Sequence, residues 1–137
     1  MLQTSYTAIK HQVASLRACY LEDCGDLRFV FCDVVHELQG MTPVCVGSFA
    51  DLVSQQEDVL NCEIVFLDIE LGVGQPTGID AYNWLMEKNY SGRIIFFTGH
   101  GKSHPEVLRA SRCPQVEILK KPIELQTLIS LLGVIDQ

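Results

Sequence analysis

The sequence predicts an α/β fold in which helices cover both faces of a parallel sheet. Two observations lead to this fold class: short apolar segments alternate with amphipathic ones, and the central apolar segments are continuous rather than alternating. Continuous runs rich in Ile, Val and Phe are typical of parallel strands buried on both faces. Right-handed crossovers then place the helices on either side. A chain of 137 residues fits one such domain.

Five short segments have the composition of buried strands. The clearest are "EIVFLD", which ends on a carboxylate, and "GRIIFFTG", which ends on a hydroxyl residue and a glycine. Each is short and bounded by polar or turn-forming residues, as expected of a strand rather than a helix. The predicted strands are 17–23, 43–48, 63–68, 92–99 and 116–122.

Helical segments separate these strands. Between Asp26 and Gln39, apolar residues recur at the spacing i, i+3, i+4, i+7, i+8 and i+11, which predicts an amphipathic helix. Gly40 and Pro43 follow it and are typical of a helix end. The predicted helices are 26–39, 49–61, 79–90, 104–112 and 124–135.

The first residues form a separate segment. Apolar residues recur there at helical spacing, which predicts an additional helix before the first strand; they are Leu2, Tyr6, Ile9, Val13 and Leu16. We therefore divide the chain into a helical N-terminal extension, residues 1–15, and a domain, residues 16–137. We interpret the extension as a packing cap or a frayed end, with a homodimer contact as the alternative.

Composition excludes several classes of protein. The net charge of −7 argues against direct contact with nucleic acid by this chain. No apolar run approaches the roughly 18 residues that a membrane span needs, and the N-terminus lacks the apolar core of a signal peptide. The six cysteines form no CxxC pair and several lie in apolar runs, so we expect reduced thiols and a cytoplasmic protein.

Polar residues end several of the predicted strands. In a parallel α/β sheet, the carboxyl ends of the strands meet in one crevice, where ligands bind. We therefore expect these side chains to converge. They are Glu22, Asp23, Asp68, Thr98 and the lysine pair Lys120 and Lys121.

These residue types suit the acceptance of a phosphoryl group. Three crowded carboxylates repel one another, and Mg²⁺, which prefers oxygen ligands and water, offsets that charge. A carboxylate is also a nucleophile toward phosphorus. The metal and a lysine stabilise charge on the transferring oxygens, and Thr98 supplies a hydroxyl donor. The sequence therefore predicts a metal-assisted, phosphoryl-accepting site.

Four segments, in order, resemble the motifs of bacterial response-regulator receiver domains, the CheY-like family: "CYLEDCGDLRFVF", "IVFLDIEL", "IIFFTG" and "ILKKPI". The resemblance covers residues from about 17 to 135 and is specific because all four motifs occur at the ends of the expected strands. It implies a flavodoxin-like fold with strand order 2-1-3-4-5.

The resemblance also implies a role for each matching residue. Glu22 and Asp23 are the expected metal-binding acids. Asp68 is the expected phosphoacceptor and a third metal ligand. Thr98 is the expected switch hydroxyl, and Lys121, which directly precedes a proline, is the expected lysine of a Lys-Pro pair joined by a cis peptide bond.

The loop after the phosphoacceptor departs from the family pattern. The segment "IELGVGQPTGID" is longer than the usual loop, and Gly72 stands where the family has a proline, although Gly78 matches the terminal glycine. The backbone carbonyl of Glu70 is the expected further metal ligand. Glu70 and His100 occupy positions that tune the lifetime of the phosphoryl group in relatives.

The expected function is that of a signalling switch rather than an enzyme with turnover, with only self-catalysed phosphorylation and slow autodephosphorylation. A histidine kinase or phosphotransfer protein is the expected donor. A downstream effector protein, or a C-terminal output domain, is the expected recipient of the signal. The motifs are similar to those in receivers of LytTR-type regulators, which bind DNA through a separate domain.

Two alternatives remain open from the sequence. One is a pseudo-receiver that binds partners without phosphorylation, since Ile118 stands where the family often has a switch Tyr or Phe. The other is a phosphohydrolase with an aspartyl nucleophile, in which Glu70 would act as acid–base. His100 and His104 have a metal-ligand spacing, but because no third ligand is evident we interpret both as exposed loop residues.

Overall fold

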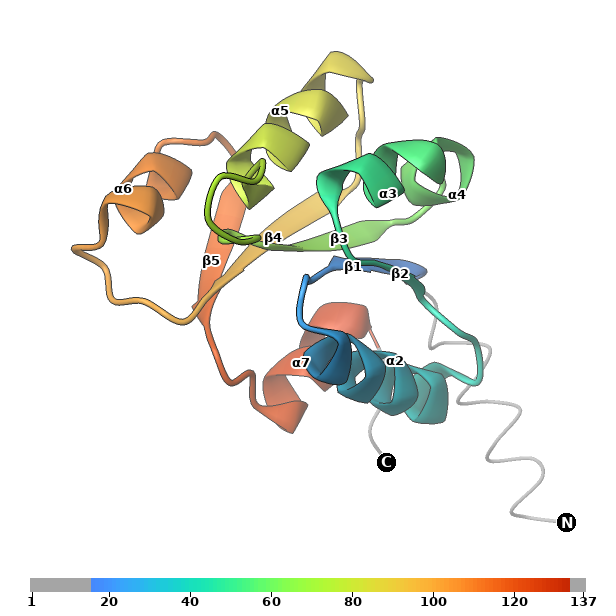
Figure 1. The fold of residues 1–137 in the computed structure, drawn as a ribbon. Coiled ribbons are helices and arrows are strands. Elements are labelled where there is room, and N and C mark those ends of the chain that lie inside the picture. The colour runs from blue at the N-terminus through green and yellow to red at the C-terminus, as the bar shows by residue number, and fades with distance from the viewer. Residues whose placement is uncertain (1–15, 134–137) are drawn as a thin grey trace, which may run out of the picture.

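The computed structural model describes residues 16–133, which form one parallel sheet with helices on both faces (Figure 1). The strand order is β2-β1-β3-β4-β5, so the predicted order 2-1-3-4-5 is confirmed. The strands are β1 (Ala18–Leu21), β2 (Val44–Val46), β3 (Ile64–Asp68), β4 (Arg93–Thr98) and β5 (Val116–Lys120).

The helices form two layers, with α2 and α7 on one face of the sheet and the other helices on the opposite face (Figure 1). The helices are α2 (Gly25–Gln39), α3 (Phe49–Ser54), α4 (Gln56–Leu60), α5 (Gly78–Glu87), α6 (Pro105–Ser111) and α7 (Leu125–Leu132). Residues 1–15, which include the predicted N-terminal helix, and residues 134–137 lie outside the described residues.

The central strand β3 shows why its sequence is continuously apolar. All five of its residues are buried. Ile64 and Phe66 pack in the core under α2 and α7, whereas Val65 and Leu67 pack in the core on the other face. Successive side chains of a strand point to opposite faces, so a strand covered on both sides needs apolar residues at every position.

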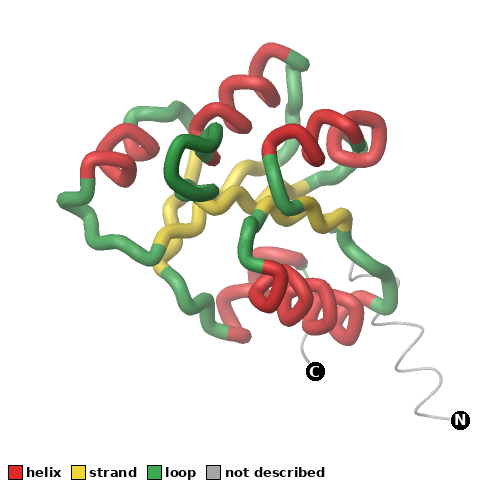
Figure 2. Tube along the Cα trace, in the orientation of Figure 1, coloured by secondary structure: helices red, strands yellow, loops and turns green. Residues whose placement is uncertain are grey.

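The strand register determines where the polar residues lie. Leu21 pairs with Leu67 across β1 and β3, so the acidic pair that follows Leu21 emerges beside Asp68. On the other side, Thr98 pairs with Lys120 across β4 and β5. Figure 2 shows the loops that leave β1, β3, β4 and β5 at one end of the sheet. The carboxyl edge therefore gathers the candidate residues from four strands.

The predicted helix over residues 49–61 is two helices in the structure, α3 and α4. Gln55 separates them with φ −106° and ψ 29°. The Ser54 hydroxyl donates a hydrogen bond of 2.7 Å to the carbonyl of Asp51, a local bond that competes with regular helix geometry. The sequence pattern did not reveal this break, because the apolar spacing continues on both sides of it.

The apolar stripe of α2 is wider than the face that the helix buries. Phe31 and Val35 are buried, but Leu27 and Val30 are 46% and 57% exposed. With the loop before α7, these exposed residues line an open, mostly apolar groove of about 470 Å³. The first turns of α2 therefore keep apolar side chains at the surface beside the carboxyl edge.

All six cysteines have free thiols. Cys19 and Cys62 are buried, whereas Cys24 is exposed. Burial raises the pKa of the Cys62 thiol to about 11, so this residue stays protonated and acts as a small apolar side chain. Within residues 16–133, no helix has the length and apolar character that a membrane crossing requires.

Gly78 gives a first test of the fold, because α5 begins against the backbone of β3. A Cβ at Gly78 would lie 2.3 Å from the carbonyl oxygen of Asp68. We expect Gly78→Ala to lower the free energy of unfolding by about 1–3 kcal/mol, the usual cost of overpacking, in a urea titration. Gly101→Ala is the matched control, since a Cβ there meets nothing within 4 Å. Equal losses in the two variants would contradict the packing seen here.

Candidate functional site

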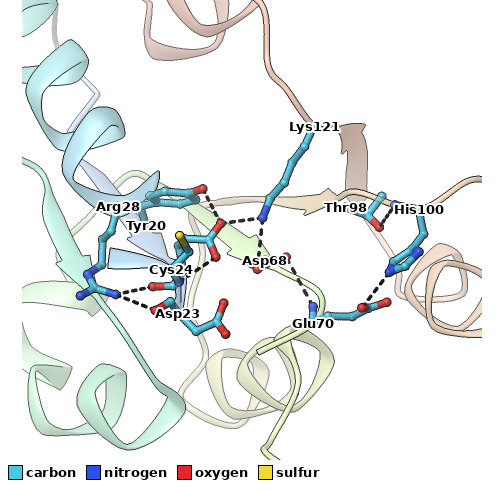
Figure 3. A network of polar contacts seen from close by, with 10 residues as sticks. Tyr20, Asp23, Cys24, Arg28, Asp68, Glu70, Thr98, His100 and Lys121 are labelled. Atoms are coloured by element: carbon cyan, nitrogen blue, oxygen red, sulfur yellow. Dashed lines mark hydrogen bonds and ion pairs between the residues drawn. The ribbon is translucent and has the colours of Figure 1, made fainter. Parts of the chain in front are cut away.

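The carboxyl edge holds a network of buried ionic groups around Lys121 (Figure 3). The Nζ atom of Lys121 lies 2.5 Å from Oε1 of Glu22 and 3.2 Å from Oδ2 of Asp68. The side chains of Glu22 and Asp68 are 1% and 8% exposed. One ammonium group therefore bridges two carboxylates that come from different strands.

Two further hydrogen bonds orient the carboxylate of Glu22. The Tyr20 hydroxyl donates to Oε1 at 3.0 Å, and the backbone N–H of Cys24 donates to Oε2 at 3.2 Å. Burial opposes the charge of Glu22, but the hydrogen bond from Lys121 and the other bonds outweigh it, so the pKa of Glu22 lies below its ordinary value. Glu22 is a fixed anion at neutral pH.

The pKa of Asp68 is shifted in the opposite direction from that of Glu22. Burial and the neighbouring charge of Glu22 raise the pKa of Asp68 from 3.8 to about 7, although Lys121 acts to lower it. Burial and Glu22 also raise the pKa of Asp23. One lysine does not offset three acids, so the negative charge at this edge is incompletely balanced by the protein.

The three acids fit a hard divalent cation. Glu22, Asp23 and Asp68 each offer a carboxylate oxygen, and these oxygens lie within 4.8 Å of one another. A few carboxylate oxygens with the remaining positions left to water are the usual coordination of Mg²⁺. Burial and, after it, the neighbouring Glu22 raise the pKa of Asp68, and a cation bound to its carboxylate would offset both effects.

Thr98 lies at the end of β4 and is 3% exposed. Its Oγ1 accepts a hydrogen bond of 3.0 Å from the backbone N–H of His100. Among the described residues it makes no hydrogen bond with Asp68. The backbone N–H of Lys121 donates to the carbonyl of Thr98 at 2.7 Å, so the ends of β4 and β5 are joined next to the site.

Glu70 contributes its backbone to one side of the site and its side chain to another. Its backbone N–H donates to Oδ1 of Asp68 at 3.4 Å. Its carboxylate turns away from Asp68 and lies 2.8 Å from Nε2 of His100 (Figure 3). Nε2 of His104 lies 3.6 Å from Oε1 of Glu70, so Glu70, His100 and His104 form a cluster beside the acidic residues.

Sequence reasoning missed two residues that shape the site. Tyr20 lies two positions before Glu22, and this period of two could have placed both side chains on one face of β1. Arg28 donates from Nη1 to the backbone carbonyl of Glu22 at 2.7 Å and to that of Asp23 at 3.4 Å. No local signal marked Arg28, because its target is a loop carbonyl.

The comparison with solved structures gives a consistent result. The receiver domain of NtrX from Brucella abortus superposes with a TM-score of 0.68 at 18% identity, over 83% of this chain and 92% of that one. Chemotaxis protein CheY4 from Vibrio cholerae gives a TM-score of 0.68 at 17% identity, over 85% and 95%. The response regulator domain of CheB from Thermotoga maritima gives 0.67 at 21% identity, over 85% and 92%.

The chain has the receiver-domain fold. At these identities the structural likeness establishes the fold, and no family model and no curated protein matches the sequence. The resemblance read from the four motifs therefore agrees with the architecture. The cis Lys121–Pro122 peptide bond that it implied is present.

Within this receiver fold, the buried charge of Asp68 has a measurable cost. The pKa of Asp68 is about 7 in the folded protein, against 3.8 for an ordinary aspartate, which stands for the unfolded chain. The folded state therefore binds the proton of Asp68 more tightly than the unfolded state does. The contribution of Asp68 to the free energy of unfolding therefore falls as the pH rises from about 4 through 7. In buffer free of divalent cations, we expect Asp68→Asn to be more stable than the wild type at pH 8 by roughly 1–3 kcal/mol, with a smaller difference at pH 5.

The measurement is chemical denaturation at both pH values. Asp33→Asn is the matched control, because Asp33 is exposed on α2. A gain in stability that is the same at both pH values would show that the electrostatic explanation is wrong.

Proposed function

We propose that this chain is a phosphoacceptor domain of a two-component signalling system. A histidine kinase or phosphotransfer protein donates a phosphoryl group to Asp68. The observation that supports this role is the position of the Asp68 carboxylate, in contact with Lys121 and within ligand distance of the carboxylates of Glu22 and Asp23.

In the proposed reaction, a carboxylate oxygen of Asp68 attacks the phosphorus of a phosphohistidine. An oxygen–phosphorus bond forms, the phosphorus–nitrogen bond breaks, and its electron pair returns to the leaving imidazole, which takes up a proton. Mg²⁺ held by Glu22, Asp23 and Asp68, with the backbone carbonyl of Glu70, would supply positive charge to the phosphoryl oxygens.

Lys121 supplies the protein's own positive charge. Burial opposes its ionisation, but the hydrogen bond to Glu22 and the charge of Asp68 outweigh burial, so the pKa of Lys121 lies above its ordinary value. The ammonium is therefore present at neutral pH. It already contacts Oδ2 of Asp68, and in the phosphorylated protein it would bind a phosphoryl oxygen instead.

Thr98 is the proposed switch residue. Its hydroxyl oxygen accepts from His100, which leaves its own hydrogen available for a phosphoryl oxygen. Moving a population from mostly inactive to mostly active takes about 5.5 kcal/mol of differential stabilisation. Hydrogen bonds to a charged group contribute about 1.5–3 kcal/mol each, so new bonds from Thr98 and Lys121 account for a shift of this size.

The proposed recipient of the signal is an effector protein or an output domain joined to the chain, bound at the face formed by α6, β5 and α7. Solved structures supply one precedent: this chain spans 26% of the longer NtrX from Brucella abortus solved in complex with ADP. The net charge of −7 makes direct nucleic-acid contact by this chain unfavourable. The free thiols support a cytoplasmic location, where thiols stay reduced.

The orientation of Glu70 favours a switch over a phosphohydrolase. A hydrolase of the kind considered above needs the acid two residues after its nucleophile to face the substrate. The Glu70 carboxylate instead bonds with His100. The pseudo-receiver remains the second candidate, because Ile118 supplies no switch aromatic ring and Thr98 bonds with His100 rather than Asp68.

Phosphorylation is tested with a small-molecule phosphodonor and Mg²⁺. We expect the intact mass to increase by one acid-labile phosphoryl group, and Asp68→Asn to abolish the increase because it removes the nucleophile. Asp33→Asn, which removes an exposed carboxylate on α2, should be labelled to the same extent as the wild type. Labelling that survives in Asp68→Asn would refute the assignment.

Metal binding separates the two candidate functions. If Mg²⁺ binds the folded state and not the unfolded state, a Mg²⁺ concentration of 100 times the dissociation constant raises the free energy of unfolding by about 2.7 kcal/mol. We expect this stabilisation in thermal melts of the wild type, its loss on chelation, and a strong reduction in Asp23→Asn. A wild-type protein that Mg²⁺ does not stabilise would favour the pseudo-receiver.

A further inference from the structure

A second cluster of metal-ligand side chains lies beside the acidic site. It consists of Glu70 from the β3–α5 loop and of His100 and His104 from the β4–α6 loop. Their ligand atoms all lie within 4.8 Å of one another. The two imidazole rings stack with centroids 4.0 Å apart. The sequence offered only the pair of histidines, because Glu70 is 30 residues earlier than His100.

Local backbone structure holds the three side chains together. β3 and β4 are neighbours, and the N–H of Ile69 donates to the carbonyl of Phe97 at 3.0 Å, which keeps the two loops adjacent as they leave the sheet. The N–H of His104 then donates to the carbonyl of Gly101 at 3.1 Å. This turn brings His104 back beside His100, so the cluster does not depend on a helical i, i+4 spacing.

The distances suit a tetrahedral metal ion. Bonds of about 2.0–2.2 Å from zinc to nitrogen and oxygen place two ligand atoms of a tetrahedron roughly 3.3–3.6 Å apart. Oε2 of Glu70 lies 2.8 Å from Nε2 of His100, and Oε1 of Glu70 lies 3.6 Å from Nε2 of His104. Small side-chain movements therefore close the site around an ion.

One oxygen of the cluster makes no hydrogen bond among the described residues, although Nε2 of His104 lies 3.6 Å away. Oε1 of Glu70 is buried and has no hydrogen bond within the described part of the chain. An unpaired buried carboxylate oxygen is costly, because the solvation it has lost is not replaced. A cation bound next to it, between the two imidazoles, would supply the missing interaction.

The ligand types of this cluster favour a different metal from the one that the acidic site favours. Imidazole nitrogens suit zinc, nickel, copper and cobalt, whereas carboxylate and carbonyl oxygens suit magnesium. Two imidazoles and one carboxylate are also a known zinc ligand set, which leaves a fourth position open. Figure 3 shows the Glu70 side chain directed at His100 and away from Asp68, so the two sites use different atoms of Glu70.

Binding requires a change of tautomer at His104. Its Nδ1 accepts a hydrogen bond of 3.2 Å from the backbone N–H of Glu106, which leaves the ring proton of the neutral imidazole on Nε2. To bind a metal through Nε2, the proton must move to Nδ1, and the capping bond to α6 is lost. Loss of this capping bond reduces the metal affinity but does not abolish binding by three ligands.

We propose that Glu70, His100 and His104 form a second metal site, selective for a divalent transition metal of the zinc type. The site is independent of phosphorylation and of the acidic magnesium site, so either proposal can fail without the other.

The direct test is calorimetric titration of the protein with Zn²⁺ in saturating Mg²⁺ and a non-chelating reductant. We expect one Zn²⁺ per chain, and at least about tenfold weaker binding in the double variant His100→Ala/His104→Ala and in Glu70→Gln. His36→Ala, a histidine on α2, and Asp23→Asn, in the acidic site, are the matched controls and should keep the wild-type affinity.

Thiols are the main competing ligands for Zn²⁺, since Cys24 is exposed. The titration is therefore repeated in Cys24→Ser, which should bind Zn²⁺ as the wild type does, and with Co²⁺, whose absorption spectrum distinguishes thiolate from nitrogen and oxygen ligands. In the unmodified protein, NMR should show Zn²⁺ shifting the ring signals of His100 and His104 while leaving those of His36 unchanged.

Three outcomes would overturn the proposal. The first is wild-type affinity in the double histidine variant, and the second is the absence of Zn²⁺ binding by the wild type. The third is loss of binding in Asp23→Asn or Cys24→Ser, which would place the ion at the acids or at a thiol instead.

Discussion

The buried contact of Lys121 with Glu22 and Asp68 is the interaction on which the rest of the site depends. Three acids at the ends of apolar strands raise the free energy of the fold unless positive charge lies among them. One ammonium provides part of that charge and ties β5 to β1 and β3. Burial and the charge of Glu22 still raise the pKa of Asp68, so its negative charge is not fully compensated. The same imbalance makes the edge suitable for a cation and a phosphoryl group.

The sheet makes this crowding possible because its strands are parallel and buried on both faces. Because each strand is packed on both faces, its position is fixed. The first residue of the loop that follows it is therefore fixed as well. The acidic pair follows β1, Asp68 ends β3 and Thr98 ends β4, so each side chain inherits its position from a different strand. The geometry of this edge therefore depends on buried core residues such as Phe66 and Phe96.

Glu70 links the two candidate metal sites. Its backbone N–H donates to Asp68, while its carboxylate bonds with His100, whose own backbone N–H donates to Thr98. The two candidate sites are therefore neighbours that use different atoms of Glu70.

The sequence by itself determined the fold class, the strand order through its motifs, and the acids, hydroxyl and lysine at the strand ends. These follow from local patterns: apolar runs specify buried strands, and the residue after a strand must lie at its edge. Only the tertiary structure decided that α3 and α4 are separate and that Leu27 stays exposed. It alone brought Glu70 to the two histidines, because contacts between side chains of different loops depend on backbone geometry that no local pattern encodes.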